Sequence, residues 1–407
     1  MSSSKLINKL KKYKDKLLFN IKYKEVFEDE NNINMFIKYV FDIGIGNTYS
    51  KVFDIGNNYI NFINSIDIKK DNYKRKKLSK KQILEYTKDV LDSIDPELKE
   101  EFIKLEKDKT IIFRNRILKL LSNNKNSHFI AYPDKRCKEE LKKVLEINNE
   151  LTFDAVKTMT HEFMHSVTDR ELKKIELDNE VKYYKNDNQK IYDEFISIYF
   201  EEYAKSFLEK NNSIPKEEFD NTSRINNIYM QGIYKKLYLP FKIFYDYGEY
   251  NYKNYKEFVI QNDIDMDSSY EGYINNKNYF LKVYKTLVVG HVEEVKKKEE
   301  HPNLFNDHYD EILKITLKTE TFDKTEYVLG TMLAFYVKDK VNPKEMLEFS
   351  RLINNDNKIE LYKNPLYKKI DEMYGEVLDG NFDYNIFLNY LKENDCINKG
   401  ATLWLKK

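Results

Sequence analysis

Glycine and proline are scarce in this chain of 407 residues, which contains only 11 glycines and seven prolines. These two residues interrupt helices and form most tight turns, so their scarcity excludes a turn-rich fold. With 34% charged residues as well, the composition is typical of a chain built chiefly from long helices.

Cysteine is scarce as well, and the chain has no marked charge imbalance and no long apolar run. Cys137 and Cys396 are far apart in the sequence and cannot frame a disulfide-stapled fold. Basic and acidic residues number 69 and 68, so the net charge of +1 indicates neither nucleic-acid nor membrane binding. No stretch approaches the ~20 apolar residues of a membrane span, and residues 1–20 lack the apolar core of a signal peptide. We expect a cytoplasmic protein, with leaderless export as the alternative.

Histidine is scarce too, yet two of the six histidines stand at the spacing of a metal site. His161, Glu162 and His165 form the pattern H-E-x-x-H within residues 152–170. Helical residues four apart lie on one face, about 5–6 Å apart at Cβ, so both imidazoles can reach one zinc ion. Glu162 then borders the open coordination position, where it can take the proton of a zinc-bound water.

The flanking residues predict the helix that this pattern needs. Thr152 is a good N-cap, and Asp154 suits the positive end of the helix dipole. Val156, Phe163 and Val167 form an apolar stripe roughly opposite the histidines, which predicts packing on one side and chemistry on the other. Two solvated histidines on an ordinary helix are the structural alternative.

A peptidase zinc site needs a third protein ligand, and a second predicted helix offers one. Residues 188–208 are strongly amphipathic, and Glu194, Ser197 and Glu201 share one face at i, i+3, i+7 spacing. Glu194, which follows His165 by 29 residues, is the predicted third ligand. Glu201 is placed to accept the second ring N–H of a ligand histidine, a contact that fixes its tautomer. A solvated acidic edge of a core helix is the alternative.

H-E-x-x-H followed at this distance by Glu-x-x-Ser-x-x-x-Glu resembles the thimet oligopeptidase and oligoendopeptidase F family of gluzincins. The resemblance covers roughly residues 155–205, and its matching residues are His161, Glu162, His165, Glu194, Ser197 and Glu201. A weaker likeness lies at residues 322–330, which are similar to the family's Tyr-x-x-Gly segment. It implies that Tyr327 helps to bind the tetrahedral intermediate, and a packed core tyrosine is the structural alternative.

Several positions depart from the family pattern. Met164 stands where the family has a glycine before its second histidine, and it crowds that turn of the helix. The tyrosines expected just before Tyr-x-x-Gly are Asp323 and Thr325, and Ile315 occupies the position of an expected histidine. His308 is the nearest upstream histidine and the candidate substitute, with a surface histidine as the alternative.

The remaining patterns predict a mainly α-helical fold with a small β element near the zinc-binding helix. The pattern over residues 79–121 is helical, with a helix start at Asp95-Pro96. Residues 128–133 and 143–148 are predicted strands, which form either a substrate-binding edge or a small structural hairpin. Asn342-Pro343 predicts another helix start.

We expect an N-terminal helical region over residues 1–125 and a catalytic region over 126–407. The two regions form either one continuous domain or helical lobes around a cleft.

The sequence therefore predicts a zinc metalloendopeptidase or oligopeptidase that hydrolyses short peptides. His161, His165 and Glu194 would hold one Zn²⁺ per chain, with Glu162 as general base. One alternative is a protein-specific zinc protease of the toxin or effector type, and another is a degenerate homologue that binds zinc and peptides without cutting. The expected partner is a peptide substrate, with no nucleic acid and no membrane, and the sequence does not indicate an oligomeric state.

Overall fold

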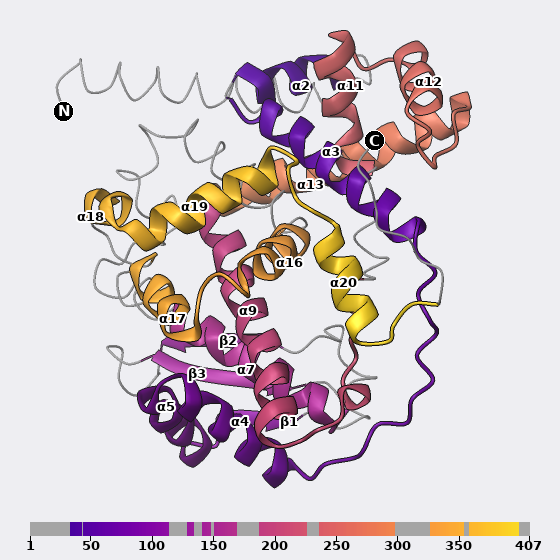
Figure 1. The fold of residues 1–407 in the computed structure, drawn as a ribbon. Coiled ribbons are helices and arrows are strands. Elements are labelled where there is room, and N and C mark those ends of the chain that lie inside the picture. Colours follow the sequence, from indigo (N-terminus) through magenta and orange to yellow (C-terminus); the bar gives the residue numbers. More distant parts are fainter. Residues whose placement is uncertain are drawn as a thin grey trace, which may run out of the picture. The chain divides into compact units, whose positions relative to one another are not determined.

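The computed structural model describes residues 33–42, 44–113, 128–133, 141–147, 150–168, 187–225, 236–297, 326–353 and 358–398. Contacts divide the chain into two compact units. Unit 1 contains residues 1–60 and 228–325, and unit 2 contains residues 61–227 and 326–407. Unit 2 therefore takes residues from both sides of the boundary expected at 125. Each unit is mainly helical, as the sequence predicts (Figure 1).

Unit 1 is a helical group with an aromatic core. Its elements are α2 (Ile33–Asp42), most of α3 (Gly46–Asn64), α11 (Leu239–Tyr247), α12 (Tyr252–Gln261) and α13 (Tyr270–Lys297). Gly44, with a φ of 82°, makes the turn between α2 and α3, and Gly248, with a φ of 75°, ends α11. The rings of Tyr49, Phe241 and Phe280 pack edge to face at centroid separations of 4.8 and 5.4 Å.

Unit 2 holds the predicted site. Its helices are α4 (Lys80–Ile94), α5 (Pro96–Lys107), α7 (Phe153–Thr168), α9 (Asp187–Asn211), η2 (Lys216–Glu218), α16 (Glu326–Val337), α17 (Pro343–Leu352), α18 (Lys358–Lys363), α19 (Pro365–Leu378) and α20 (Asn385–Glu393). Local sequence explains several starts. Ser79 and Asn342 form capping boxes, and Asp95 caps α5 directly before Pro96. The helix starts predicted at Asp95-Pro96 and Asn342-Pro343 are confirmed.

Three short strands complete unit 2. They are β1 (Ile111–Phe113), β2 (His128–Pro133) and β3 (Leu141–Ile147), in the spatial order β1-β3-β2. β2 runs antiparallel to β3, with His128 opposite Glu146, whereas β1 runs parallel to β3, with Ile111 opposite Leu145. The two predicted strands are confirmed within the described residues.

Strand β1 corrects the helical prediction over residues 79–121, part of which lies outside the described residues. Helix α5 ends at Lys107, and Lys109 adopts a φ of 56°, which turns the backbone out of the helix. The Leu145 N–H of β3 then donates to the Thr110 carbonyl at 3.0 Å. The partner strand lies more than thirty residues later, so helical periodicity cannot reveal it.

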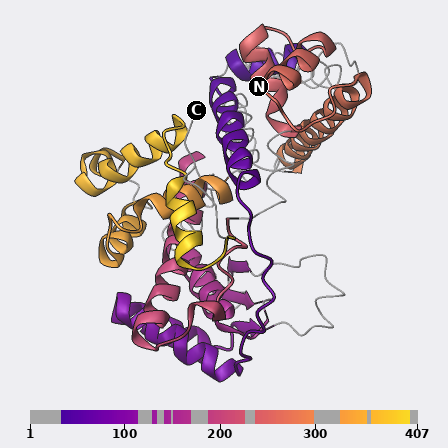
Figure 2. The ribbon, with the colours of Figure 1, turned by 45° about the vertical axis from the view of Figure 1, so that its right-hand side comes forward.

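Helix α9 is the centre of unit 2. It contacts α7, α16, α4 and α17, and every residue from 191 to 202 is buried. Helix α7 lies beside α9 (Figures 1 and 2), and β2 and β3 pack against α7. Any ionisable side chain in the middle of α9 is therefore inside the protein, where it needs a partner of opposite charge.

Helix α16 is the apolar partner of α9. Its residues from Val328 to Phe335 are all buried, because α9, α19 and α20 contact it. Its length of 12 residues corresponds to about 18 Å, well short of the ~30 Å hydrocarbon core of a bilayer. No helix in the described part of the chain is both long and apolar enough to cross a membrane.

Candidate metal centre

Helix α7 carries the two histidines in the predicted way. It begins at Phe153, with Asp154 in its first turn, and the apolar stripe of Val156, Phe163 and Val167 is buried. The opposite face is not open to solvent, because α9 covers it. The face of α7 that carries the histidines therefore borders a partly enclosed polar region between α7 and α9.

Helix α9 supplies that region with charge. The buried ionisable residues in its middle are Asp193, Glu194, Glu201, Glu202 and Lys205. Burying an uncompensated charge is strongly unfavourable, and removing the partner of a buried charge typically costs about 3–5 kcal/mol. The side chains around α9 therefore have to supply partners for these carboxylates.

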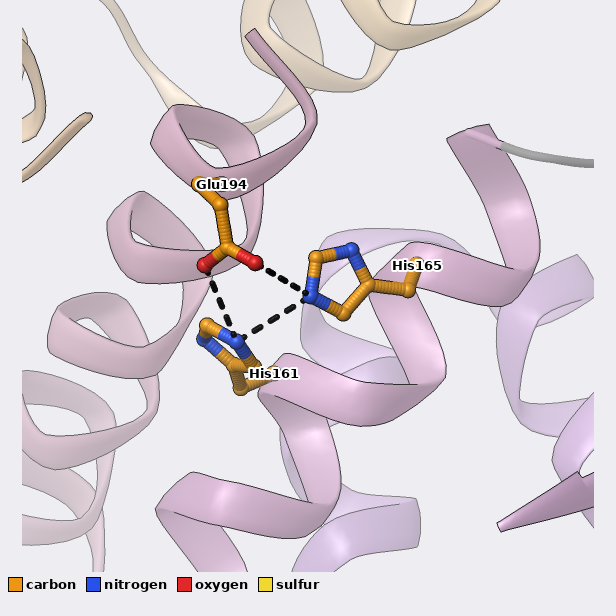
Figure 3. A group of neighbouring side chains, drawn as sticks. All are labelled: His161, His165 and Glu194. Atoms are coloured by element: carbon orange, nitrogen blue, oxygen red, sulfur yellow. Dashed lines mark hydrogen bonds and ion pairs between the residues drawn. The ribbon is translucent and has the colours of Figure 1, made fainter. Parts of the chain in front are cut away.

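His161 and His165 from α7 and Glu194 from α9 point toward one another (Figure 3). The two Nε2 atoms lie 3.2 Å apart. Glu194 Oε1 lies 3.4 Å from His165 Nε2, and Glu194 Oε2 lies 3.6 Å from His161 Nε2. Within the described ranges, His161, His165 and Glu194 form a group that could hold a metal ion, because each offers one ligand atom within 4.8 Å of the other two. The structure thus brings together the three predicted ligands.

These separations suit a tetrahedral zinc ion. Ligand atoms ~2.0–2.1 Å from a tetrahedral centre lie ~3.3–3.4 Å from one another, and the two Nε2 atoms are 3.2 Å apart. Each Nε2 atom also lies 3.4 or 3.6 Å from a different oxygen of the Glu194 carboxylate. Glu194 Oε2 is buried and accepts no hydrogen bond from the described residues, so a cation would satisfy it. Three protein ligands would leave one position of a tetrahedral ion open, as in catalytic rather than structural zinc sites.

Two further residues of α9 face the outer nitrogens of the histidine rings. Glu201 Oε2 lies 3.3 Å from His161 Nδ1, and Ser197 Oγ lies 3.2 Å from His165 Nδ1. The Glu201 contact is a charge–dipole contact rather than a well-aligned hydrogen bond. An ionised carboxylate only accepts hydrogen bonds, so it favours a proton on Nδ1 of His161. The Nε2 lone pair of that ring is then directed at the ligand cluster.

The charges around the cluster favour a cation. Burial lowers the pKa of the His165 imidazole, but the carboxylates of Glu194, Glu162 and Asp193 outweigh burial and raise that pKa to about 9. Burial raises the pKa of Glu194, but His165 and His161 outweigh it and lower that pKa to about 2. The field that stabilises a proton here also stabilises a divalent cation, which competes with that proton.

Two cations beside Glu201 are not singled out by the sequence analysis. Lys157 Nζ lies 3.7 Å from Glu201 Oε1, and the Arg224 guanidinium pairs with Glu201 Oε2. Burial raises the pKa of the Glu201 carboxyl, but Arg224 foremost outweighs it and holds that pKa well below its usual range. Lys157 stands four residues before His161, a spacing that signals a shared helix face. Arg224 has no such signal, because it lies 23 residues after Glu201.

The oxyanion candidate Tyr327 lies on another helix of unit 2, α16. A Cβ built on Gly330 of α16 would lie 3.1 Å from Phe195 N and 3.2 Å from Glu194 Cβ. Tyr327 lies about one turn earlier in α16 and is 39% exposed. The Tyr-x-x-Gly segment therefore ends close to Glu194, the predicted third ligand. His308 lies outside the described residues.

Replacing Gly330 with alanine is expected to destabilise the protein and to weaken metal binding. The new methyl group would approach α9 more closely than ordinary van der Waals contact, so α16 must shift away from Glu194. Overpacking of this kind costs about 1–3 kcal/mol. Thermal unfolding and zinc titration measure the two effects.

Gly375→Ala in α19 is the matched control. A Cβ at this helical position meets nothing within 4 Å, and alanine is favoured over glycine in a helix by about 1 kcal/mol. We expect this variant to be as stable as the wild type or more stable. Equal destabilisation of the two variants would contradict the close approach at Gly330.

Comparison of the chain with protein-family models, with curated proteins and with solved structures finds no match.

Proposed function

We propose that the protein is a zinc-dependent peptidase of the gluzincin type, with one Zn²⁺ held by His161, His165 and Glu194. The observation that carries this proposal is that His161, His165 and Glu194 each offer a ligand atom within 4.8 Å of the other two, with the two imidazole Nε2 atoms 3.2 Å apart. The outer contacts of Glu201 and Ser197 support it, because ligand histidines in zinc sites generally have such partners.

Glu162 is the residue that we assign to proton transfer. When bound, zinc polarises a carbonyl oxygen and lowers the pKa of a coordinated water towards ~7. The Glu162 carboxylate takes the proton of the attacking water and later delivers it to the leaving amine. Its side chain is 7% exposed, and it forms no hydrogen bond or ion pair within the described part of the chain. Its oxygens are therefore available to a water molecule.

Stabilisation of the oxyanion is assigned to the start of α16. Gly330 packs against the backbone beside Glu194, and Tyr327 stands about one turn before it. A hydroxyl that donates to the developing oxyanion contributes about 3–4 kcal/mol in comparable sites. Tyr327 is the residue of this segment that the family resemblance also selects.

Short peptides are the substrates that we propose. The resemblance to the thimet oligopeptidase and oligoendopeptidase F family supports this class. An extended peptide can also pair with an exposed sheet edge, and β1 and β2 are the two edge strands of the sheet beside α7. A backbone aligned on the edge of β2, which contacts α7, would run close to the ligand helix.

Removing the metal is expected to abolish peptide cleavage, and zinc is expected to restore it. Protein stripped with a chelator and dialysed is assayed on a quenched-fluorescent peptide library, before and after one equivalent of Zn²⁺ is added. Mg²⁺ and Ca²⁺ prefer all-oxygen ligand sets and should not restore turnover.

The same assay separates the alternatives. Cleavage of candidate proteins but not of peptides would favour a protein-specific protease. Peptide binding without cleavage would favour a degenerate zinc-binding homologue. Cleavage that persists after complete removal of the metal would overturn the proposal.

A further inference from the structure

We propose that Arg224 is a positioning residue of the metal centre, which holds the Glu201 carboxylate so that Glu201 orients the His161 ring. The inference rests on the zinc site of the proposed function. It extends that site to a residue outside both ligand helices, in the segment that follows η2.

The contacts form a relay from Arg224 to the ligand. The Arg224 guanidinium pairs with Glu201 Oε2, and the same oxygen lies 3.3 Å from His161 Nδ1. The other carboxylate oxygen, Glu201 Oε1, lies 3.7 Å from Lys157 Nζ. Cations therefore face both oxygens of Glu201, and the oxygen that Arg224 holds is the one beside the histidine.

Lys157 alone does not suffice to hold the Glu201 carboxylate beside His161, because Lys157 also faces a second carboxylate. Its Nζ lies 3.7 Å from Glu201 Oε1 and 3.7 Å from Glu202 Oε1, and both glutamates are buried. Lys157 is thus divided between two neighbouring buried carboxylates, and Arg224 is the second cation at Glu201. Without Arg224, we expect Glu201 to turn toward Lys157 and to leave the His161 ring without its outer partner.

The backbone before Arg224 is anchored to the start of the ligand helix. The Asp220 N–H donates to Asp154 Oδ1 in the first turn of α7 at 2.9 Å. Asp220 Oδ1 in turn accepts the N–H groups of Thr222 and Ser223 at 3.1 and 3.0 Å, which closes a local turn. Helix α7 therefore places both His161 and the turn that presents Arg224.

A pocket of about 470 Å³ borders this network. Its lining includes Lys157, Glu201 and Ser223. Water in the pocket can solvate the Glu201 carboxylate when the guanidinium is removed. The expected effect of losing Arg224 is therefore a poorly oriented ligand rather than a collapsed fold.

Zinc affinity of Arg224→Ala tests the proposal. Loss of an outer partner typically weakens metal binding ~10–100-fold, and we expect that loss here, measured by competition with a chromophoric chelator. The visible absorption of the Co²⁺-substituted protein should also change, because it reports ligand geometry. Arg351→Ala is the matched control, since Arg351 is 49% exposed and pairs with Asp95 and Glu97. It should leave both readouts unchanged.

A double-mutant cycle distinguishes positioning from a general structural role. If Arg224 acts through Glu201, the variant with Arg224→Ala and Glu201→Gln should bind zinc no more weakly than Glu201→Gln alone. Additive losses would overturn the proposal. Arg224→Gln, which keeps most of the side-chain volume, provides the same test if Arg224→Ala does not fold.

Failure of this inference is distinguishable from failure of the proposed function. A wild-type protein that does not bind zinc would refute the metal centre itself. Zinc binding by wild type with unchanged affinity and Co²⁺ spectrum in the Arg224 variants would overturn the positioning role alone, whatever the outcome of the peptide assay.

Discussion

Replacing Glu162 with glutamine is expected to lower peptide turnover by about 10²–10⁴-fold, the usual contribution of general acid–base catalysis. The amide has nearly the same shape as the carboxylate but cannot accept the proton of the attacking water. Glu162 is not one of the three proposed ligands, so the zinc content should remain that of the wild type. The turnover of a quenched-fluorescent peptide measures the loss of activity. Metal analysis of the same sample checks that the zinc content is unchanged.

Glu209→Gln is the matched control for this substitution. Glu209 lies near the end of α9, where its side chain is 30% exposed and pairs with Lys205. It stands 15 residues after Glu194, about 22 Å along the helix. We expect its turnover and zinc content to match the wild type. Unchanged turnover in Glu162→Gln would remove Glu162 from the mechanism.

Replacing Glu194 with alanine is expected to weaken zinc binding by more than the ~10–100-fold that loss of an outer partner costs. Glu194 is the one ligand from α9, and its two oxygens face both histidines. Its loss leaves two nitrogens four residues apart on one helix, which is an incomplete set for a tetrahedral ion. Peptide turnover should disappear with the metal.

Thermal unfolding with and without zinc measures this effect on folding. Zinc that binds only the folded wild type should stabilise it, by about 4 kcal/mol at a thousandfold excess over Kd. Zinc should not shift the melting temperature of Glu194→Ala, whereas Glu209→Ala on the same helix should respond as the wild type does. Stoichiometric, tightly bound zinc in Glu194→Ala would refute its assignment as the third ligand.

The residues of the proposed metal centre were predictable from the sequence because their spacing is a property of single helices. His161 and His165 are one turn apart on α7, and Glu194, Ser197 and Glu201 share a face of α9. A helix of known pitch places such residues together whatever surrounds it. The pairing of the two faces then follows from chemistry, since zinc accepts both imidazole and carboxylate.

Interactions between residues far apart in the sequence could not be predicted from the spacing of residues within a helix. The pattern over residues 79–121 predicts helix, yet Ile111–Phe113 form β1, because β3 is available to pair with them. The amphipathic pattern of α9 predicts one buried side, yet residues 191–202 are buried on every side by α7, α16, α4 and α17. The periodicity of apolar residues reflects the secondary structure that a segment prefers. Packing against other elements decides the final structure and how much of the segment's surface is buried.

Local sequence patterns are enough to predict the helical character of this protein, several helix starts and the set of candidate zinc ligands. All of these depend on contacts within a few residues along the chain. Tertiary packing is responsible for three further features: α9 lies in the core, Gly330 packs against Glu194, and Arg224 pairs with Glu201. Each of these depends on buried charge and close packing between segments far apart in the sequence, which no local pattern encodes.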